Sequence, residues 1–260
     1  MHLQILPGGC RLEGGRAVAK KRRSGGGLRG SIKGLSQAAA ARLRWFLVSH
    51  YVPGYACRAV TRTIHRPATA DDWRACAKRW RMAVKRRKWA EPWRVELQKR
   101  KTPHAHSALW TPEDVTEDEI RDLWLHCTRE SGDPEAVAHA VVFGPASGSG
   151  SAWTAYLCSH MGKSKAAQLG WKGKQWGIIN RHLFEPVPVF ELELTVRAAT
   201  WFARLVRRWA SSRFVDKKGR RLRVFTSDRG FARALDGSVV PRLAQAAQLL
   251  GGSVLENRPF

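Results

Sequence analysis

Apolar residues recur along the chain at two spacings, one typical of helices and one typical of strands. Leu43, Phe46 and Leu47 share a helical face behind Ser36, a residue type that often caps helices. A helix is therefore expected to begin near residue 36. Residues 55–64, YACRAVTRTI, alternate and are rich in β-branched side chains, which predicts a strand.

A second helix and a hairpin follow in the sequence. Thr69 and Asp72 form a helix start signal. The apolar side chains that follow it at helical spacing, and that we expect in the core, are Trp73, Ala77, Trp80 and Val84. Residues 93–98 (WRVELQ) and 104–110 (HAHSALW) predict strands, and the basic segment 99–103 joins them as a turn.

The second half of the chain predicts further short elements. Segment 113–135 holds nine acidic residues and two arginines, and we expect its helix to face away from nucleic acid. The expected buried stripe of this helix is Ile120, Leu123, Trp124 and Cys127. Residues 139–145 predict a strand, and 146–151 a loop. A helix is expected from about Ser151, followed by a loop that ends in KQWGIIN.

These elements predict an α+β fold in which an antiparallel sheet is flanked by helices. Residues 1–34 contain KKRR, SGGGLRGS and eight basic residues against one acid, which predicts a flexible basic arm. The main domain is expected over residues 35–196. Residues 197–260 then form a basic appendage, with a helix carrying Trp201, Leu205 and Trp209 and a hairpin turn at 216–220.

The charge of the chain indicates a globular protein with a polyanionic partner. Lys plus Arg is 46 against 21 Asp plus Glu, the net charge is +25 and the pI is about 11.1, which favours nucleic acid over an anionic membrane surface. No apolar run is long enough to span a membrane, and we expect a cytoplasmic protein without a membrane partner. The five cysteines include no CxxC pair and are expected to be reduced thiols.

The pair His104 and His106 is a candidate metal site. Residues i and i+2 of a strand share a face, so both imidazoles project together. A hairpin that turns near Arg100 places Glu96 or Gln98 on the same face, and Glu96 pairs best. Two imidazoles and a carboxylate suit Mn²⁺ or Mg²⁺ presented to a phosphate, while zinc remains possible on ligand type alone.

A candidate nucleophile follows on the helix expected after Ser151. Tyr156, His160 and Lys163 fall at i, i+4 and i+7 on one helical face. The same spacing is equally typical of an exposed surface with a snorkelling lysine.

The order of these blocks resembles the HUH endonucleases, the replication initiators of rolling-circle plasmids and single-stranded DNA phages. The resemblance covers about residues 35–180 and rests on LSQAAAARLRWFL, VELQKRKTPHAHSALW and AYLCSHMGKSK in this order, with KQWG downstream. It implies an RRM or ferredoxin-like core, His104, His106 and Glu96 as metal ligands, Tyr156 as the nucleophile and Lys163 as the helix lysine.

The implied function is to nick one strand at a rolling-circle origin, which leaves a 5′-phosphotyrosyl link and a free 3′-OH. The implied partners are single-stranded and origin DNA, together with a host helicase and polymerase. Many similar proteins carry a second tyrosine where this chain has His160, which is expected to act as a proton acceptor instead. No oligomeric state follows from the sequence.

Two alternatives stay open on the sequence. A relaxase-like mobilisation protein would use a tyrosine before the histidines, Tyr51 or Tyr55. A non-catalytic nucleic-acid-binding protein would use the histidines only to stabilise the sheet. The GKS at 162–164 lacks the glycine that a phosphate-binding loop needs five residues earlier, so no ATPase or helicase domain is expected.

Three basic regions are expected to hold the DNA backbone: residues 1–34, 78–88 and 207–223. Trp171 and Trp176 are candidates for base stacking.

Overall fold

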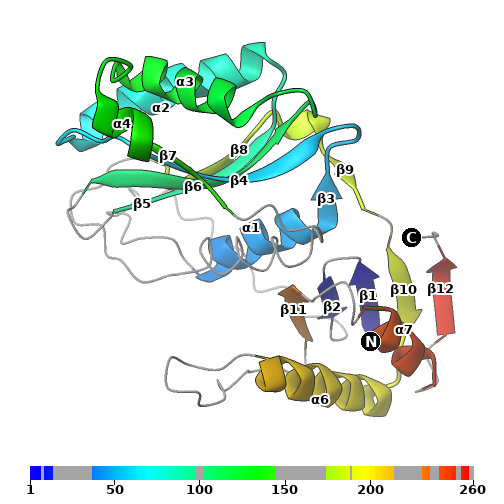
Figure 1. Ribbon diagram of the computed structural model, residues 1–260. Coiled ribbons are helices and arrows are strands. Elements are labelled where there is room, and N and C mark those ends of the chain that lie inside the picture. Colours follow the sequence, from blue (N-terminus) through cyan, green and yellow to red (C-terminus); the bar gives the residue numbers. More distant parts are fainter. Residues whose placement is uncertain are drawn as a thin grey trace, which may run out of the picture. The chain divides into compact units, whose positions relative to one another are not determined.

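The chain divides into two compact units, unit 1 (residues 1–26 and 187–260) and unit 2 (residues 27–186) (Figure 1). The fold is α+β, with antiparallel sheets and flanking helices, as the sequence predicts. The computed structural model describes residues 1–6, 9–13, 37–97, 102–144, 174–187, 189–213, 230–234, 240–249 and 253–257.

Unit 2 is built on a five-stranded sheet in the order β7-β4-β6-β5-β8, with antiparallel neighbours throughout. Its strands are β4 (Ala56–Thr63), β5 (Glu91–Leu97), β6 (Pro103–Thr111), β7 (Val141–Phe143) and β8 (Trp176–Ile179). The expectation of a loop through KQWGIIN is wrong, because β8 pairs with the outer side of β5. Residues 176–179 are too few for their apolar pattern to predict a strand when the partner strand is not known.

The helices of unit 2 are α1 (Gln37–Ser49), α2 (Ala70–Arg86), α3 (Glu117–Thr128) and α4 (Pro134–His139), with a 3₁₀ turn η1 (Arg181–Leu183). Helices α1 and α2 begin close to the predicted positions, α3 lies within the segment predicted to hold a helix, and α4 was not predicted. Capping boxes start two of them: Thr69 and Asp72 bond each other's backbone N–H groups at α2, and Thr116 and Glu119 do so at α3. A small second sheet pairs β3 (His50–Tyr51) with β9 (Glu185–Pro186).

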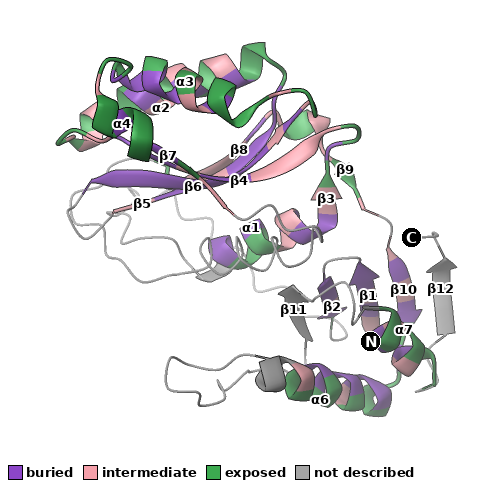
Figure 2. Ribbon diagram, viewed as in Figure 1, coloured by how far each residue is buried: buried purple, intermediate pink, exposed green. Residues whose placement is uncertain are grey.

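The helices cover both faces of the sheet. Helices α2, α3 and α4 lie over one face, and α1 lies over the other (Figure 1). Alternation along β6 explains this arrangement, because Leu109 joins the core under α2 and α3 while Ala108 packs with Leu43 of α1. Figure 2 shows the matching pattern of buried strands and of helices that are exposed on their outer side.

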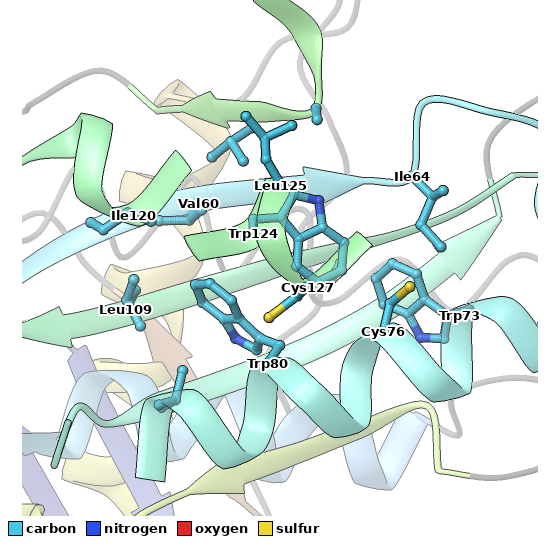
Figure 3. Packing of buried hydrophobic residues seen from close by; sticks show 14 of the residues in the cluster. Val60, Ile64, Trp73, Cys76, Trp80, Leu109, Ile120, Trp124, Leu125 and Cys127 are labelled. Carbon is cyan, nitrogen blue, oxygen red and sulfur yellow. The ribbon is translucent and has the colours of Figure 1, made fainter. Parts of the chain in front are cut away.

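The core between α2, α3 and the sheet is rich in tryptophan (Figure 3). Trp80 and Trp124 meet edge to face, with ring centroids 5.8 Å apart, and Trp73 lies 5.6 Å from Trp124. The predicted stripes are confirmed for the side chains that the structure buries, which are Trp73, Trp80, Val84, Ile120, Trp124 and Cys127. Ala77 and Leu123 are half-buried at the edges of this core.

A buried ion pair lies within this aromatic core. Arg62 is 3% exposed and pairs with Glu91, which is fully buried. The indole Nε1 of Trp80 donates to the other carboxylate oxygen of Glu91 at 2.7 Å. The Arg62 guanidinium also lies 4.1 Å from the ring centroid of Trp80 and 5.1 Å from that of Trp124. Each charge therefore has both an opposite charge and an aromatic or hydrogen-bonding neighbour.

Unit 1 joins the two ends of the described chain in one sheet, in the order β11-β2-β1-β10-β12. The strands are β1 (His2–Leu6), β2 (Gly9–Glu13), β10 (Phe190–Glu193), β11 (Gly230–Ala234) and β12 (Ser253–Asn257), and the helices are α6 (Val196–Arg213) and α7 (Val240–Leu249). The expectation of a flexible arm is therefore wrong for residues 2–6 and 9–13, which form β1 and β2. Leu3, Ile5 and Leu12 of these strands are buried in the core of unit 1.

The predicted helix of the C-terminal segment is present as α6, and Trp209 packs against the core of unit 1. Phe202 and Val206 are fully buried, whereas Trp201 is 51% exposed and Leu205 is 38% exposed. The predicted hairpin turn at 216–220 lies outside the described residues. Because β1 and β2 complete the sheet beside β10, residues 197–260 are not an independent appendage.

Candidate metal centre

The hairpin of β5 and β6 brings the predicted ligands together. Glu96 stands opposite His104, and Arg94 stands opposite His106, which is the register predicted from the sequence. On the other side of β6, Thr61 of β4 stands opposite His106. All five side chains therefore rise from the sheet face that also carries α1, and the site lies at the centre of three adjacent strands.

Three potential ligand atoms converge on one point. The Nε2 atoms of His104 and His106 are 2.9 Å apart. The Oε1 atom of Glu96 lies 2.9 Å from Nε2 of His106 and 3.3 Å from Nε2 of His104. Each histidine is only 7% exposed. Among the residues that the structure describes, these three form the one group of His, Cys, Asp and Glu side chains arranged to hold a metal ion.

The surrounding side chains hold two of the ligands in place. The hydroxyl of Thr61 lies 3.0 Å from Nδ1 of His106, the ring nitrogen that does not face Glu96. A guanidinium nitrogen of Arg94 lies 3.6 Å from Oε2 of Glu96. By contrast, the buried Nδ1 of His104 has no hydrogen-bond partner within the described ranges. The His106 ring therefore has a polar contact on each of its two nitrogens, whereas the polar contacts of His104 are made through Nε2.

Electrostatics keep Glu96 ionised. Burial alone raises the pKa of the Glu96 carboxyl, but hydrogen bonds from His104 and His106, with the charges of His106 and Arg94, outweigh it and hold the pKa well below its usual range. Burial also lowers the pKa of the Arg94 guanidinium, and the Glu96 charge opposes that change. The site therefore presents a carboxylate oxygen beside two imidazole nitrogens.

This convergence has a chemical consequence. One carboxylate oxygen and two ring nitrogens face one another at hydrogen-bond distance, and their lone pairs repel unless protons or a cation lie between them. Histidine nitrogens and carboxylate oxygens are also common ligands of divalent metals. The three residues thus form a candidate site for a divalent metal ion, as the sequence predicts.

The other predicted catalytic residues lie outside the described residues. This holds for Tyr156, His160 and Lys163, and for the whole helix expected from Ser151. Tyr51 and Tyr55 are described, and neither is placed beside the metal site by its strand. Tyr55 precedes β4 and lies six residues from Thr61, which corresponds to about 20 Å along an extended strand. Tyr51 pairs with Glu185 in the separate small sheet.

Sequence reasoning overlooked two members of the site. Arg94 could have been found, because it lies two residues before Glu96 in a strand and must share its face. Thr61 could not, since it comes from β4, and the pairing of β4 with β6 is not encoded in a short turn.

The predicted DNA-contacting residues are only partly described. On α2 and just after it, Lys78, Arg81, Lys85, Arg86 and Arg87 are exposed, as a basic surface requires. Trp176 instead packs against α1, where it contacts the Leu43 cluster and lies 5.9 Å below the guanidinium of Arg42. Trp171 lies outside the described residues, as does most of 207–223.

Comparison with known proteins gives no relative: no family model, curated protein or solved structure matches this chain. A search of the described helices for one long and apolar enough to cross a bilayer finds none.

Proposed function

We propose that this protein is a metal-dependent DNA endonuclease of the HUH type that nicks one strand at a rolling-circle replication origin. The observation that supports this most is the convergence of Glu96, His104 and His106 on adjacent central strands. The net charge of +25 supports a nucleic-acid substrate.

The spacing of the three ligand atoms favours Mn²⁺ or Mg²⁺. Ligands about 2.1 Å from an ion and at right angles to each other are about 3.0 Å apart, whereas tetrahedral ligands are about 3.4 Å apart. Two of the observed separations are 2.9 Å and the third is 3.3 Å, so two of the three match an octahedral shell. Three protein ligands leave positions in such a shell for phosphate oxygens and water.

The topology of unit 2 also supports the proposal. The order β4-α2-β5-β6-α3-β7, with α4 inserted before β7, is a βαββαβ arrangement, and the four strands are ordered β7-β4-β6-β5. This is the order of a ferredoxin-like core. The ligands lie on β5 and β6, on the face of the sheet away from α2 and α3.

The proposed chemistry assigns one role to each residue. A divalent ion held by Glu96, His104 and His106 would neutralise charge on the scissile phosphate. The Tyr156 hydroxyl attacks phosphorus, the bond from phosphorus to the 3′ oxygen breaks, and that oxygen leaves as a 3′-OH after gaining a proton. His160 accepts the proton of Tyr156 and Lys163 steadies the phosphate. The product is a 5′-phosphotyrosyl link, whose phosphodiester can be resealed without ATP.

The test is a covalent adduct assay. A labelled pool of random single strands is incubated with the protein and Mn²⁺, and adducts are resolved on a denaturing gel. Wild type and the control variants Tyr51→Phe and His139→Ala, whose side chains are exposed and outside the site, should form the adduct. His106→Ala and Tyr156→Phe should not, although both should still bind DNA.

The assay separates the alternatives. An adduct mapped by mass spectrometry to Tyr51 or Tyr55 would indicate the relaxase-like mechanism. A protein that binds the pool but forms no adduct with any divalent ion would be a non-catalytic binding protein.

A further inference from the structure

A second site opens on the opposite face of the unit 2 sheet. A pocket of about 260 Å³ lies between α2 and the β5–β8 edge. Trp93 and Ala105 line it. In its strand Trp93 is next to Arg94, and Ala105 lies between His104 and His106. Since side chains alternate between faces, the pocket and the metal centre lie on opposite sides of the sheet.

The walls of the pocket are aromatic and apolar. Trp73 of α2 and Trp93 of β5 contribute indole rings, and Ala77 and Ala105 supply small apolar surface. The Trp93 ring lies directly against Gly177 of β8, where an added Cβ would come within 3.1 Å of three ring atoms. Gly177 therefore lets the indole lie close to the strand. Such a pocket suits a planar, apolar group.

The rim of the pocket is strongly basic. Arg74, Lys78 and Arg81 fall at i, i+4 and i+7 along α2, and Lys174 faces them from the segment before β8. None of the described residues that line the pocket is acidic. Arg74 pairs with Asp71, but Lys78 and Arg81 form no ion pair with any residue in the described ranges. A ligand at this rim should therefore carry negative charge.

Arg62 supplies a polar group at the base of the pocket. It lines the pocket although it is 3% exposed. Its terminal nitrogen pairs with Glu91, but its Nε–H is buried with no acceptor among the described residues. A buried donor without an acceptor is costly, and an acceptor on a bound ligand would satisfy it.

We infer that this pocket binds one nucleotide, with its base between Trp73 and Trp93 and its phosphate at Lys78, Arg81 and Lys174. The volume is slightly below the range of about 300–1,000 Å³ found for drug-sized ligands, so it has room for one base. A base has a planar surface that can stack on the aromatic walls. It also has ring-nitrogen or carbonyl acceptors that can bind the Arg62 Nε–H. The nucleotide is either free or part of a single strand. The inference is independent of the nicking proposal, because it uses the other face of the sheet.

The test measures the contribution of the base, because charge alone attracts any phosphate. Calorimetry at physiological ionic strength compares dAMP with deoxyribose 5-phosphate, which has the phosphate and sugar without the base. Wild type should bind dAMP at least about ten-fold more tightly, in line with the energy of stacking a base on an aromatic side chain. Equal affinity for the two compounds would overturn the inference.

Matched variants then locate the site. Lys78→Ala/Arg81→Ala should weaken dAMP binding by about ten-fold or more. Arg197→Ala/Arg204→Ala removes the same charge from exposed positions of α6 that do not line the pocket, and should leave the affinity within about two-fold of wild type, because salt screens exposed charges. Equal losses in both double variants would show diffuse attraction and no pocket.

Two further variants test the base contacts. Trp93→Leu should abolish the preference for dAMP over deoxyribose 5-phosphate. If Trp93→Leu unfolds, Ala77→Glu is the deciding variant. It keeps a helix former at a half-buried position and places a carboxylate in the pocket, so it should weaken dAMP binding. Undiminished dAMP binding by a folded Ala77→Glu would refute the site.

A final arm distinguishes the source of the nucleotide. A short single strand that displaces dAMP, and that loses at least about five-fold in affinity when one central position is made abasic, identifies a strand nucleotide. A strand that does not displace dAMP identifies free nucleotide as the ligand. In either case, nicking by the Trp93 and Lys78/Arg81 variants is measured separately, so failure of one proposal is not mistaken for failure of the other.

Discussion

The hydroxyl of Thr61 lies 3.0 Å from Nδ1 of His106, and it reaches the ring from a different strand and from the side away from Glu96. A hydrogen bond to the outer ring nitrogen fixes the orientation of a metal-binding histidine. Thr61 is therefore expected to act as a positioning residue for the metal centre.

Thr61→Val should reduce Mn²⁺ affinity by about 10–100-fold without unfolding the protein, because it removes the hydroxyl and keeps the side-chain shape. Thr61→Ser should retain most of the affinity. Mn²⁺ binding is measured by paramagnetic resonance of the free ion. Wild-type affinity in Thr61→Val would show that the contact does not orient His106.

Divalent ions should stabilise the folded protein through the three ligands. An ion at about 100 times its dissociation constant adds about 2.7 kcal/mol to the free energy of unfolding. Mn²⁺ should thus raise the melting temperature, and a chelator should reverse the rise. The double variant His104→Ala/His106→Ala should show no such rise, and an equal rise in that variant would place the ion elsewhere.

The buried pair of Arg62 and Glu91 should be a sensitive point of the unit 2 core. Glu91→Ala leaves the Arg62 charge and the Trp80 N–H without their partner, and should cost about 3–5 kcal/mol of unfolding free energy. Urea denaturation measures this loss. The control Asp118→Ala breaks an exposed pair with Arg121 and should change stability little; similar losses in both variants would contradict the role of burial.

The capping box of α2 should give stability that depends on pH. Hydrogen bonds from the backbone and side chain of Thr69 hold the pKa of Asp72 below its ordinary value. Stability from this carboxylate is therefore complete above the unfolded-state pKa of about 3.9 and is lost as pH falls through the lower folded-state pKa. Thr69→Ala should cost about 1 kcal/mol at neutral pH. The difference from wild type, measured by denaturation, should shrink in acid, and a constant difference would exclude the carboxylate.

Binding to single-stranded DNA should weaken steeply with salt. Arg86→Ala/Arg87→Ala should reduce the slope of log K against log salt by about 1.4, which corresponds to two phosphate contacts of about 0.7 each. Fluorescence anisotropy at several salt concentrations gives the slope. An unchanged slope would show that these exposed arginines face away from the bound strand.

The convergence of Glu96, His104 and His106 could be predicted because the β5–β6 hairpin is local. Its short turn fixes the parity of the β5–β6 pairing, and parity decides that Glu96 shares a face with His104 and His106. The helix start at Thr69 is equally local, since it depends on two side chains three residues apart. Features of this kind require no knowledge of distant segments.

Most of the strands and buried helix faces that were missed depend on distant partners. Leu3 and Ile5 alternate as a strand should, but their partner β10 lies nearly two hundred residues later, and the basic glycine-rich run after them suggested an arm. Trp201 and Leu205 have helical spacing, as do Phe202 and Val206, and only the sheet of unit 1 decides which pair is buried. Strand β8 likewise becomes recognisable only beside β5.

The pairing of β1 with β10 sets an order for folding. His2 stands opposite Glu193, so the ribosome must release nearly two hundred residues before β1 can pair with β10. Unit 2 lies wholly between those strands in the sequence and can collapse while synthesis continues. During that interval, Leu3 and Ile5 lie on β1 before its partner β10 has been synthesised. Their side chains are then exposed to chaperones and to aggregation.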